Sequence, residues 1–171
     1  MTDAAAPAAT ATADHLLLFN RDVFHALNLR PGPRVVRVDH HDGDRLVGSL
    51  VGVREGDVVT SGHSAPFGGP DLVRDAETAA NVVALLERAV GELDADGVRT
   101  VRVRCRPAFY SGSETAVQFA LLNLGFRVES CELSFHIDLE PLDGIDAYVA
   151  GLRSPRPWRR ARRAGERRPA T

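Results

Sequence analysis

The sequence predicts a mixed α/β domain flanked by helices, and three observations carry this prediction. The chain has 171 residues, of which 44% are apolar and 26% charged, enough to bury one core but not two. Residues 34–61 contain strand-like runs separated by tight turns. Residues 75–152 then alternate between helical and strand-like patterns, which is the order expected when helices pack on a sheet.

The first predicted element is a short helix over residues 20–28. Val23, Phe24 and Leu27 fall on one helical face. The run Pro31-Gly32-Pro33 cannot continue a helix. We therefore expect a brief helix with one apolar face.

Consecutive antiparallel strands are predicted next, as a meander. The strand-like runs are Arg34–Asp39, Arg45–Val53 and Asp57–Ser61. Asp42-Gly43 separates the first two runs and Glu55-Gly56 the second pair. Because Asp-Gly between alternating apolar runs is a strong hairpin signal, each strand should pair with the next.

The longest helix is predicted after the loop Gly62–Pro70. Apolar residues at helical spacing identify it: Val82, Leu86, Ala89, Val90 and Leu93. Asp75 and Glu77 suit the positive N-terminal end of a helix, and Gly97 suits a position past the other end. We expect the helix to begin near Asp75.

A two-sided strand is predicted over Thr100–Arg106, ended by Pro107. Apolar side chains alternate with basic ones along it: Val101, Val103 and Cys105 on one face, and Arg102, Arg104 and Arg106 on the other. A segment of this kind is expected to bury its apolar face.

A further helix should start at the capping-box pattern Ser111-Gly112-Ser113-Glu114 and close at Gly125. Its expected buried positions are Val117, Leu121 and Leu124. The run Phe126–Leu139 then predicts a long strand, and Asp143–Leu152 predicts a last helix.

The two ends of the chain differ in composition from its body. Residues 1–13 have no periodic apolar pattern, so we expect a disordered tail. Residues 153–171 hold eight arginines and one acid, which predicts a basic tail able to attract RNA or an acidic partner. The body of the domain is expected over residues 14–152.

No targeting or membrane segment is expected. The start of the chain lacks the basic residues and apolar run of a secretory signal, and no apolar run approaches the about 18 residues that a membrane helix needs. We therefore expect a cytoplasmic protein.

The order of elements, and the run A-V-Q-F-A-L-L-N-L-G-F at Ala116–Phe126, resemble the GNAT superfamily of acyl-CoA N-acyltransferases. The resemblance covers Asn20 to Leu139. It implies a GNAT-like mixed central sheet with an antiparallel meander, flanked by helices.

Four shorter stretches are similar to a narrower group, the Fem-type (FemAB-like) tandem acyltransferases. They are Ser64–Gly69, Arg106–Tyr110, Phe135–Leu139 and the arginine-rich Arg159–Gly165. In such proteins two GNAT-like halves follow each other, and an arginine-rich helix ends the first half. The chain resembles a first half without its second.

This resemblance implies transfer of an acyl or aminoacyl group to a small-molecule or peptide amine. The implied donors are an acyl-CoA such as acetyl-CoA, or aminoacyl-tRNA, with no metal. The implied partners are a second GNAT half or a second copy. Because chemistry in this group rests mainly on the second half, we expect no acetyl transfer by the isolated chain.

Candidate binding residues lie in one loop: Ser64, Phe67, Gly68 and Gly69. GNAT enzymes hold the CoA pyrophosphate with backbone amides of a glycine-rich loop at this place, and Gly68-Gly69 is what corresponds here. The pair either lets a ligand approach the backbone closely or forms a turn that needs positive φ.

Tyr110 and His63 are the candidate catalytic residues. Many GNAT enzymes have a proton-donating tyrosine four residues before the Gly-Phe pair, where this chain has Leu121. Since leucine cannot donate a proton, Tyr110 is the candidate donor, the alternative being an aromatic lid. His63 is the one histidine placed beside the glycine pair for acid or base work.

Arg104 and Arg106 complete the candidate binding residues. With Arg102 they form a ladder that could hold a carboxylate or phosphate, or pair with acids such as Glu132 or Asp138. The histidines and the two cysteines form no metal-ligand pattern, so no metal is expected. The alternative function is a non-catalytic binding or scaffold domain whose basic tail docks an acidic partner or RNA.

Overall fold

The computed structural model describes residues 15–135 and 145–151. The chain divides into two compact units, Met1–Ser130 and Cys131–Thr171. The first unit contains the sheet, and the described part of the second contains helix α4 (Ile145–Gly151).

The last predicted helix is therefore confirmed over its described positions. The expectations for residues 1–13, for residues 136–139 and for the basic tail 153–171 lie outside the described residues. None of the helices in the described part of the chain combines the length and apolar character needed to span a bilayer.

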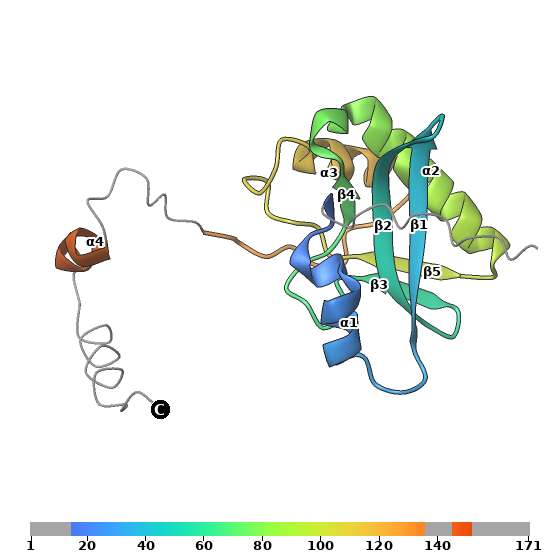
Figure 1. Ribbon diagram of the computed structural model, residues 1–171, viewed down its shortest axis with the longest axis horizontal. Coiled ribbons are helices and arrows are strands. Elements are labelled where there is room, and N and C mark those ends of the chain that lie inside the picture. The colour runs from blue at the N-terminus through green and yellow to red at the C-terminus, as the bar shows by residue number, and fades with distance from the viewer. Residues whose placement is uncertain (1–14, 136–144, 152–171) are drawn as a thin grey trace, which may run out of the picture. The chain divides into compact units, whose positions relative to one another are not determined.

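A five-stranded mixed sheet is the centre of the first unit (Figure 1). Its strands are β1 (Arg34–Asp42), β2 (Arg45–Glu55), β3 (Val58–Ser61), β4 (Pro70–Leu72) and β5 (Thr100–Val103). The predicted meander is confirmed, because β1, β2 and β3 pair antiparallel in sequence order. β3 then pairs parallel with β5, through a connection that contains helix α2 (Ala79–Ala95). The prediction of a mixed α/β domain is correct.

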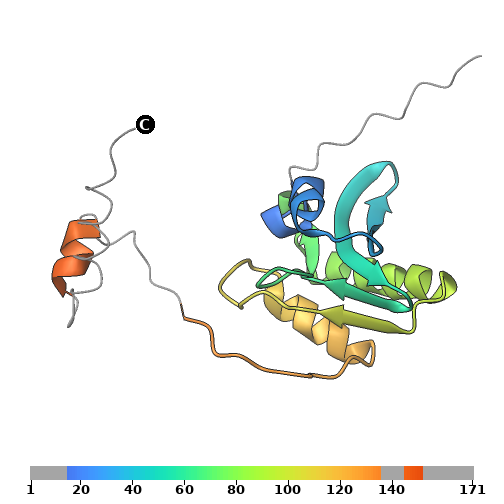
Figure 2. The same cartoon turned by 90° about the horizontal axis from the view of Figure 1, so that it is seen from below.

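The β1–β2 hairpin is the longest ladder of the sheet. The hairpin forms where the sequence predicts it, but Asp42 pairs with Arg45, so the two turn residues are Gly43 and Asp44 rather than Asp42 and Gly43. Figure 2 shows how far the sheet twists between this hairpin and β5, in keeping with the usual twist of adjacent strands.

Strand β4 was not predicted. It pairs with Gly48–Leu50 of β2, whereas β3 pairs with Val53–Glu55 of the same strand. The two short strands therefore share one edge of β2. A three-residue strand that begins with proline is too short for alternation to reveal it.

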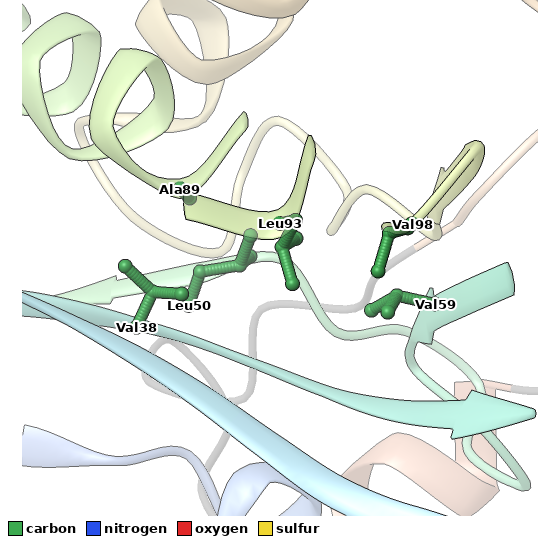
Figure 3. Packing of buried hydrophobic residues seen from close by; sticks show 6 residues of the cluster. All are labelled: Val38, Leu50, Val59, Ala89, Leu93 and Val98. Carbon is green, nitrogen blue, oxygen red and sulfur yellow. The ribbon is translucent and has the colours of Figure 1, made fainter. Parts of the chain in front are cut away.

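Helix α2 covers one face of the sheet. Buried side chains from both layers form the core between them (Figure 3): Val38, Leu50, Val59, Ala89, Leu93 and Val98. Burial of a large aliphatic side chain of this kind contributes about 1.5–3 kcal/mol. The sheet and α2 are thus joined by apolar packing.

The expected start of α2 near Asp75 is wrong. Arg74–Ala76 forms a separate 3-10 turn, and α2 begins at Ala79 because Thr78 caps it. The Thr78 hydroxyl accepts a hydrogen bond of 3.2 Å from the N–H of Asn81, which satisfies one of the free donors of the first turn.

Helix α3 (Glu114–Asn123) forms where the sequence predicts it, and it packs beside α2. A second buried cluster joins it to α2 and β4: Leu72, Val82, Leu86, Val117, Ala120 and Leu121. The expected capping box does not form, because Ser113 is the N-cap and makes no side-chain capping bond. Instead the Ser111 hydroxyl donates to the Glu114 carboxylate at 2.8 Å.

The apolar face predicted for the first helix is wrong. In α1 (Asp22–Asn28) Val23 and Leu27 are 59% and 82% exposed, and His25 is the buried residue. A seven-residue helix makes only about two turns. Its orientation is set by contacts of its neighbours, such as the packing of Phe19 on Phe24.

The long strand predicted from Phe126 is absent over residues 126–135, the part that the structure describes. Val128, Leu133 and Phe135 are all exposed. Alternation predicts a strand only if a neighbouring strand completes its hydrogen bonds, and these residues pair with none.

Candidate functional site

The candidate site begins at the glycine loop, residues 62–69, which leaves the sheet after β3 and returns at β4. Ser61 is fully buried at its base. Its hydroxyl donates to the carbonyl of Val51 at 2.7 Å and accepts from the N–H of Gly69 at 2.9 Å. The Ser61 side chain thus satisfies the carbonyl of Val51 and the N–H of Gly69. Val51 lies between the stretch of β2 that pairs with β4 and the stretch that pairs with β3.

Arg104 fastens both ends of the glycine loop. Its N–H donates to the carbonyl of Ser61, and its own carbonyl accepts from Gly68 at 2.8 Å. Its guanidinium donates to the carbonyl of Ala65 at 2.9 Å. Strand β5 ends at Val103, and of the two backbone groups of Arg104 only the carbonyl bonds to the loop, because the N–H bonds to Ser61 of β3. In this structure Arg104 supports the loop, and it does not line the pocket described below.

Gly68 and Gly69 are each required by the shape of the loop. A Cβ on Gly68 would lie 2.3 Å from the nitrogen of Gly62, closer than atoms can approach. Gly69 has φ of 89°, so the alternative of a positive-φ turn is correct for Gly69. Because both amides already donate within the chain, they do not form a pyrophosphate cradle.

A row of aromatic rings runs from α1 through the glycine loop to Tyr110. Ring centroids lie 5.3 Å apart for Phe24 and Phe19, 5.4 Å for Phe19 and Phe67, and 5.0 Å for Phe67 and Tyr110. Edge-to-face contacts at such distances are favourable. The glycine loop and the Tyr110 loop therefore lie side by side, with Phe67 half-buried.

Arg106 lies beneath Tyr110 and is only 8% exposed. Its guanidinium donates to Asp71 at 2.9 Å and also to the carbonyl of Pro70. Its Nε lies 2.9 Å from the Glu114 carboxylate, but the N–H is not directed at that oxygen, so this contact is an ion pair without a good hydrogen bond.

The arginine ladder of the sequence therefore separates into different roles. Arg106 is paired with acids, as the second alternative expected, but with Asp71 and Glu114 rather than with Glu132 or Asp138. Arg102 lies 3.8 Å from Glu129 on the exposed surface. The ladder does not present its guanidinium groups together to one ligand.

Asp71 connects the N-terminal segment to β4. One carboxylate oxygen accepts from the N–H of Leu17 at 3.0 Å and from the Asn20 amide at 2.8 Å. The other accepts from Arg106. Asp71 and Arg106 are both nearly inaccessible to solvent, and removing one partner from such a pair is strongly destabilising.

Glu114 is a buried carboxyl, only 1% exposed. Burial raises its pKa above the ordinary value. Arg106 and the Ser111 hydroxyl oppose this effect, while the charge of Asp71 adds to it. The pKa of the Cys105 thiol is also raised, by burial and by Glu114, so this thiol is a poor nucleophile.

A pocket of about 270 Å³ opens beside Tyr110. Its polar lining includes five side chains besides the Asp71–Arg106 pair: His15, Glu77, Tyr110, Ser111 and Ser113. Of the candidate residues named from the sequence, Arg106 and Tyr110 line this pocket. Phe67 packs on the ring of Tyr110 but does not line the pocket.

Sequence reasoning missed His15, Asp71 and Glu77. Asp71 had one local signal, an acid between the glycine pair and an apolar run. His15 directly precedes the apolar run Leu16–Phe19 and Glu77 lies before a helix, and neither belongs to a motif that points to a binding site.

His63 and Ser64 do not line the pocket. His63 lies close enough to His25 for its charge to lower the pKa of that residue, although burial is the larger cause and Asp22 acts in the opposite direction. The structure therefore places His63 beside α1. Ser64 is exposed in the glycine loop.

A second polar cluster brings together residues typical of hydrolases. The Ser49 hydroxyl donates to Asp39 at 2.5 Å and lies 3.0 Å from Nε2 of His15. Ser49 is completely buried and lies between the other two, whereas a catalytic serine must be exposed and the histidine must lie between serine and acid. This cluster joins β1, β2 and the N-terminal segment, and is not a nucleophile site.

No group of three or more His, Cys, Asp or Glu residues within the described ranges is arranged to hold a metal ion. Comparison of the chain with protein-family models, curated proteins and solved structures found no match in any of the three. The pocket beside Tyr110 and its neighbours therefore carry the functional inference.

Proposed function

We propose that this chain is a GNAT-like acyltransferase domain that takes part in transfer of an acyl or aminoacyl group to an amine. The observation that carries the proposal is the parallel pairing of β3 with β5 through α2, directly after an antiparallel meander. This is the order of elements on which the resemblance to GNAT proteins rests. A crossover helix of this kind is the usual link between parallel strands.

The pocket beside Tyr110 is the proposed site for the transferred group or the amine. Its volume of about 270 Å³ is just below the usual range for ligand sites, so it suits an acyl group or a small amine and not a whole CoA molecule. The Glu77 carboxylate at the pocket can attract a protonated amine.

Tyr110 is the proposed proton donor to the leaving group. It lines the pocket, is 45% exposed and is held by the ring of Phe67. Leu121 is packed in the core between α2 and α3 and cannot serve in its place. A phenol positioned in this way can give up a proton as negative charge develops on a leaving group.

The donor is proposed to be acetyl-CoA or aminoacyl-tRNA, held mainly by a second GNAT-like half or a second copy. The glycine loop does not offer free amides for a pyrophosphate, so the phosphate groups of either donor need binding residues elsewhere. We therefore expect weak donor binding and no acetyl transfer by this chain alone.

Calorimetry with acetyl-CoA and with aminoacyl-tRNA tests this function. We expect one donor to bind, and Tyr110→Ala to weaken its binding. Phe109→Ala should leave the binding unchanged, because Phe109 is similarly exposed but does not line the pocket. Binding of neither donor, or acetyl transfer that survives Tyr110→Phe, would contradict the proposal.

A non-catalytic binding domain is the second candidate function. Two observations favour it. The Gly68 and Gly69 amides donate hydrogen bonds within the chain and are not free for a phosphate, and the position of the usual proton donor is held by the buried Leu121. In this case RNA or an acidic protein would bind through the basic tail, with strong salt dependence. Deleting residues 153–171 would then abolish that binding, whereas it would not change binding of a small donor at Tyr110.

A further inference from the structure

The pocket beside Tyr110 carries more negative than positive charge. Asp71, Glu77 and Arg106 all line it. The charge of Arg106 is already shared by two carboxylates, those of Asp71 and Glu114. Glu77 is exposed, and none of the described residues forms an ion pair with it. The pocket therefore keeps an excess negative charge, whether or not the buried Glu114 holds its proton.

Two features near the pocket act in the opposite direction. The first turn of α3 has a partial positive charge, but the carboxylate of Glu114 lies in that same turn. His15 lines the pocket and adds a positive charge when it is protonated. At about pH 8 a histidine is neutral, so in mildly alkaline solution the negative charge prevails and favours a cation.

The serine hydroxyls at the pocket form a directed chain of hydrogen bonds. Ser111 donates its hydroxyl proton to Glu114 at 2.8 Å. The Ser113 hydroxyl lies 2.9 Å from that of Ser111. Because a hydroxyl has one proton to donate, Ser113 is the donor in this contact. Ser113 is then left with lone pairs only, so it can accept a hydrogen bond from a ligand in the pocket but cannot donate one.

Apolar side chains complete the lining of the pocket. They are Leu16, Leu17 and Leu72, of which Leu16 and Leu72 are buried. A short carbon chain in the pocket would therefore meet leucine side chains. The volume of about 270 Å³ limits the ligand to a small molecule.

We propose that this pocket binds a small primary alkylammonium ion, with its N–H groups toward Glu77 and Ser113 and its carbon chain against the leucines. Hydrogen bonds from an ammonium group to a carboxylate are stronger than those between neutral groups. The inference rests on the proposed function in one respect, because this amine would be the acceptor of the acyl group. It goes further by assigning the pocket to the amine, so that the acyl group meets it at the exposed side of Tyr110.

Nuclear magnetic resonance titration of the full chain tests the proposal, at about pH 8 and in a buffer without amines. The probes are propylammonium, propan-1-ol and propionate, whose carbon chains are equal in length and whose charges differ. We expect propylammonium to bind at least about threefold more tightly than propan-1-ol, and propionate not to bind.

Variants of the pocket show which groups hold the cation. Glu77→Gln should weaken propylammonium binding about three- to fivefold, since a charge pair at an exposed carboxylate contributes modestly. Glu87→Gln is the matched control, because Glu87 is an exposed acid that does not line the pocket, and it should leave binding unchanged. Ser113→Ala should also weaken binding, whereas Thr115→Ala, at an exposed position of α3, should not. Far-UV circular dichroism checks that each variant keeps the fold.

The outcomes separate this inference from the proposed function. Equal binding of the three probes, tighter binding of propionate, or binding of propylammonium that Glu77→Gln leaves unchanged would each overturn the inference. If acetyl-CoA or aminoacyl-tRNA binds and propylammonium does not, only the assignment of the pocket to the amine is overturned. If propylammonium binds and neither donor does, the ammonium site stands and the acyltransferase function is contradicted.

Discussion

At the scale of single residues, Arg106 organises the candidate site. It joins Asp71 of β4 to Glu114 of α3, and its guanidinium carbon lies 5.9 Å from the centre of the Tyr110 ring. A cation over an aromatic ring is favourable. The buried Arg106 guanidinium thus holds Asp71 in the pocket lining and contacts the ring of Tyr110 beside it.

Replacing Arg106 should therefore be costly. Arg106→Met leaves the carboxyl groups of Asp71 and Glu114 buried without their cation, and we expect the free energy of unfolding to fall by about 3–5 kcal/mol. Urea denaturation measures this change. Arg102→Met is the matched control on the same segment, and because Arg102 is exposed its effect should stay within about 0.5 kcal/mol. Equal effects of the two variants would show that the buried ion pairs do not matter.

The raised pKa of Glu114 predicts a pH dependence of stability. A carboxyl whose pKa is higher in the folded state than its ordinary value of 4.5 binds its proton more tightly when folded. Its contribution is fully present below pH 4.5 and is lost as the pH rises through the folded-state pKa.

Comparison with Glu114→Gln isolates this contribution. The difference in unfolding free energy, unmodified chain minus variant, should fall as the pH rises from 4.5 toward neutrality. Urea denaturation at several pH values gives the difference. An increase with pH would mean that Arg106 lowers the pKa of Glu114 more than burial raises it.

At the scale of elements, the glycine loop depends on the close approach of the backbone at Gly68 to the backbone at Gly62. Gly68→Ala would force a Cβ against the nitrogen of Gly62, so we expect a loss of stability of about 1–3 kcal/mol from overpacking. Gly112→Ala is the control, because a Cβ there meets nothing within 4 Å. Thermal melting distinguishes them, and a Gly68→Ala protein as stable as the control would show that the loop can rearrange freely.

Helix α2 offers a prediction of the opposite sign. Gly91 is exposed in the middle of this helix, and an added Cβ would meet no atom. Gly91→Ala should therefore raise the unfolding free energy by about 0.5–1 kcal/mol, since alanine loses less backbone entropy. A lower melting temperature would show that the helix needs glycine at this position.

The elements differ in how far sequence could predict them. The β1–β2 hairpin, α2 and α3 follow from turn residues and apolar periods that act within a few positions along the chain. β4 does not, because it exists by pairing with the distant Gly48–Leu50. The segment 126–135 differs from β4 in the opposite way. Its apolar alternation predicts a strand, but no neighbouring strand pairs with it in this structure.

At the scale of the whole molecule, the candidate site draws on distant parts of the chain. Phe67, Arg106 and Tyr110 could be named as candidate site residues because they belong to short motifs of the sequence. The partners of Arg106 could not, because Asp71 is 35 positions away in sequence and a single acid has no periodic signal. His15 and Glu77 joined the pocket in the same way. Pairing between individual charges depends on tertiary packing, which local patterns do not encode.

The proposed function requires that the pocket beside Tyr110 is the ligand site of a GNAT-like acyltransferase domain. Amide resonances of the isotope-labelled chain, followed by nuclear magnetic resonance during titration with acetyl-CoA and with aminoacyl-tRNA, test this requirement. We predict that one donor shifts or broadens the resonances of residues at the pocket: His15, Glu77, Tyr110, Ser111 and Ser113. Changes confined to other parts of the chain, or no change with either donor, would contradict the claim.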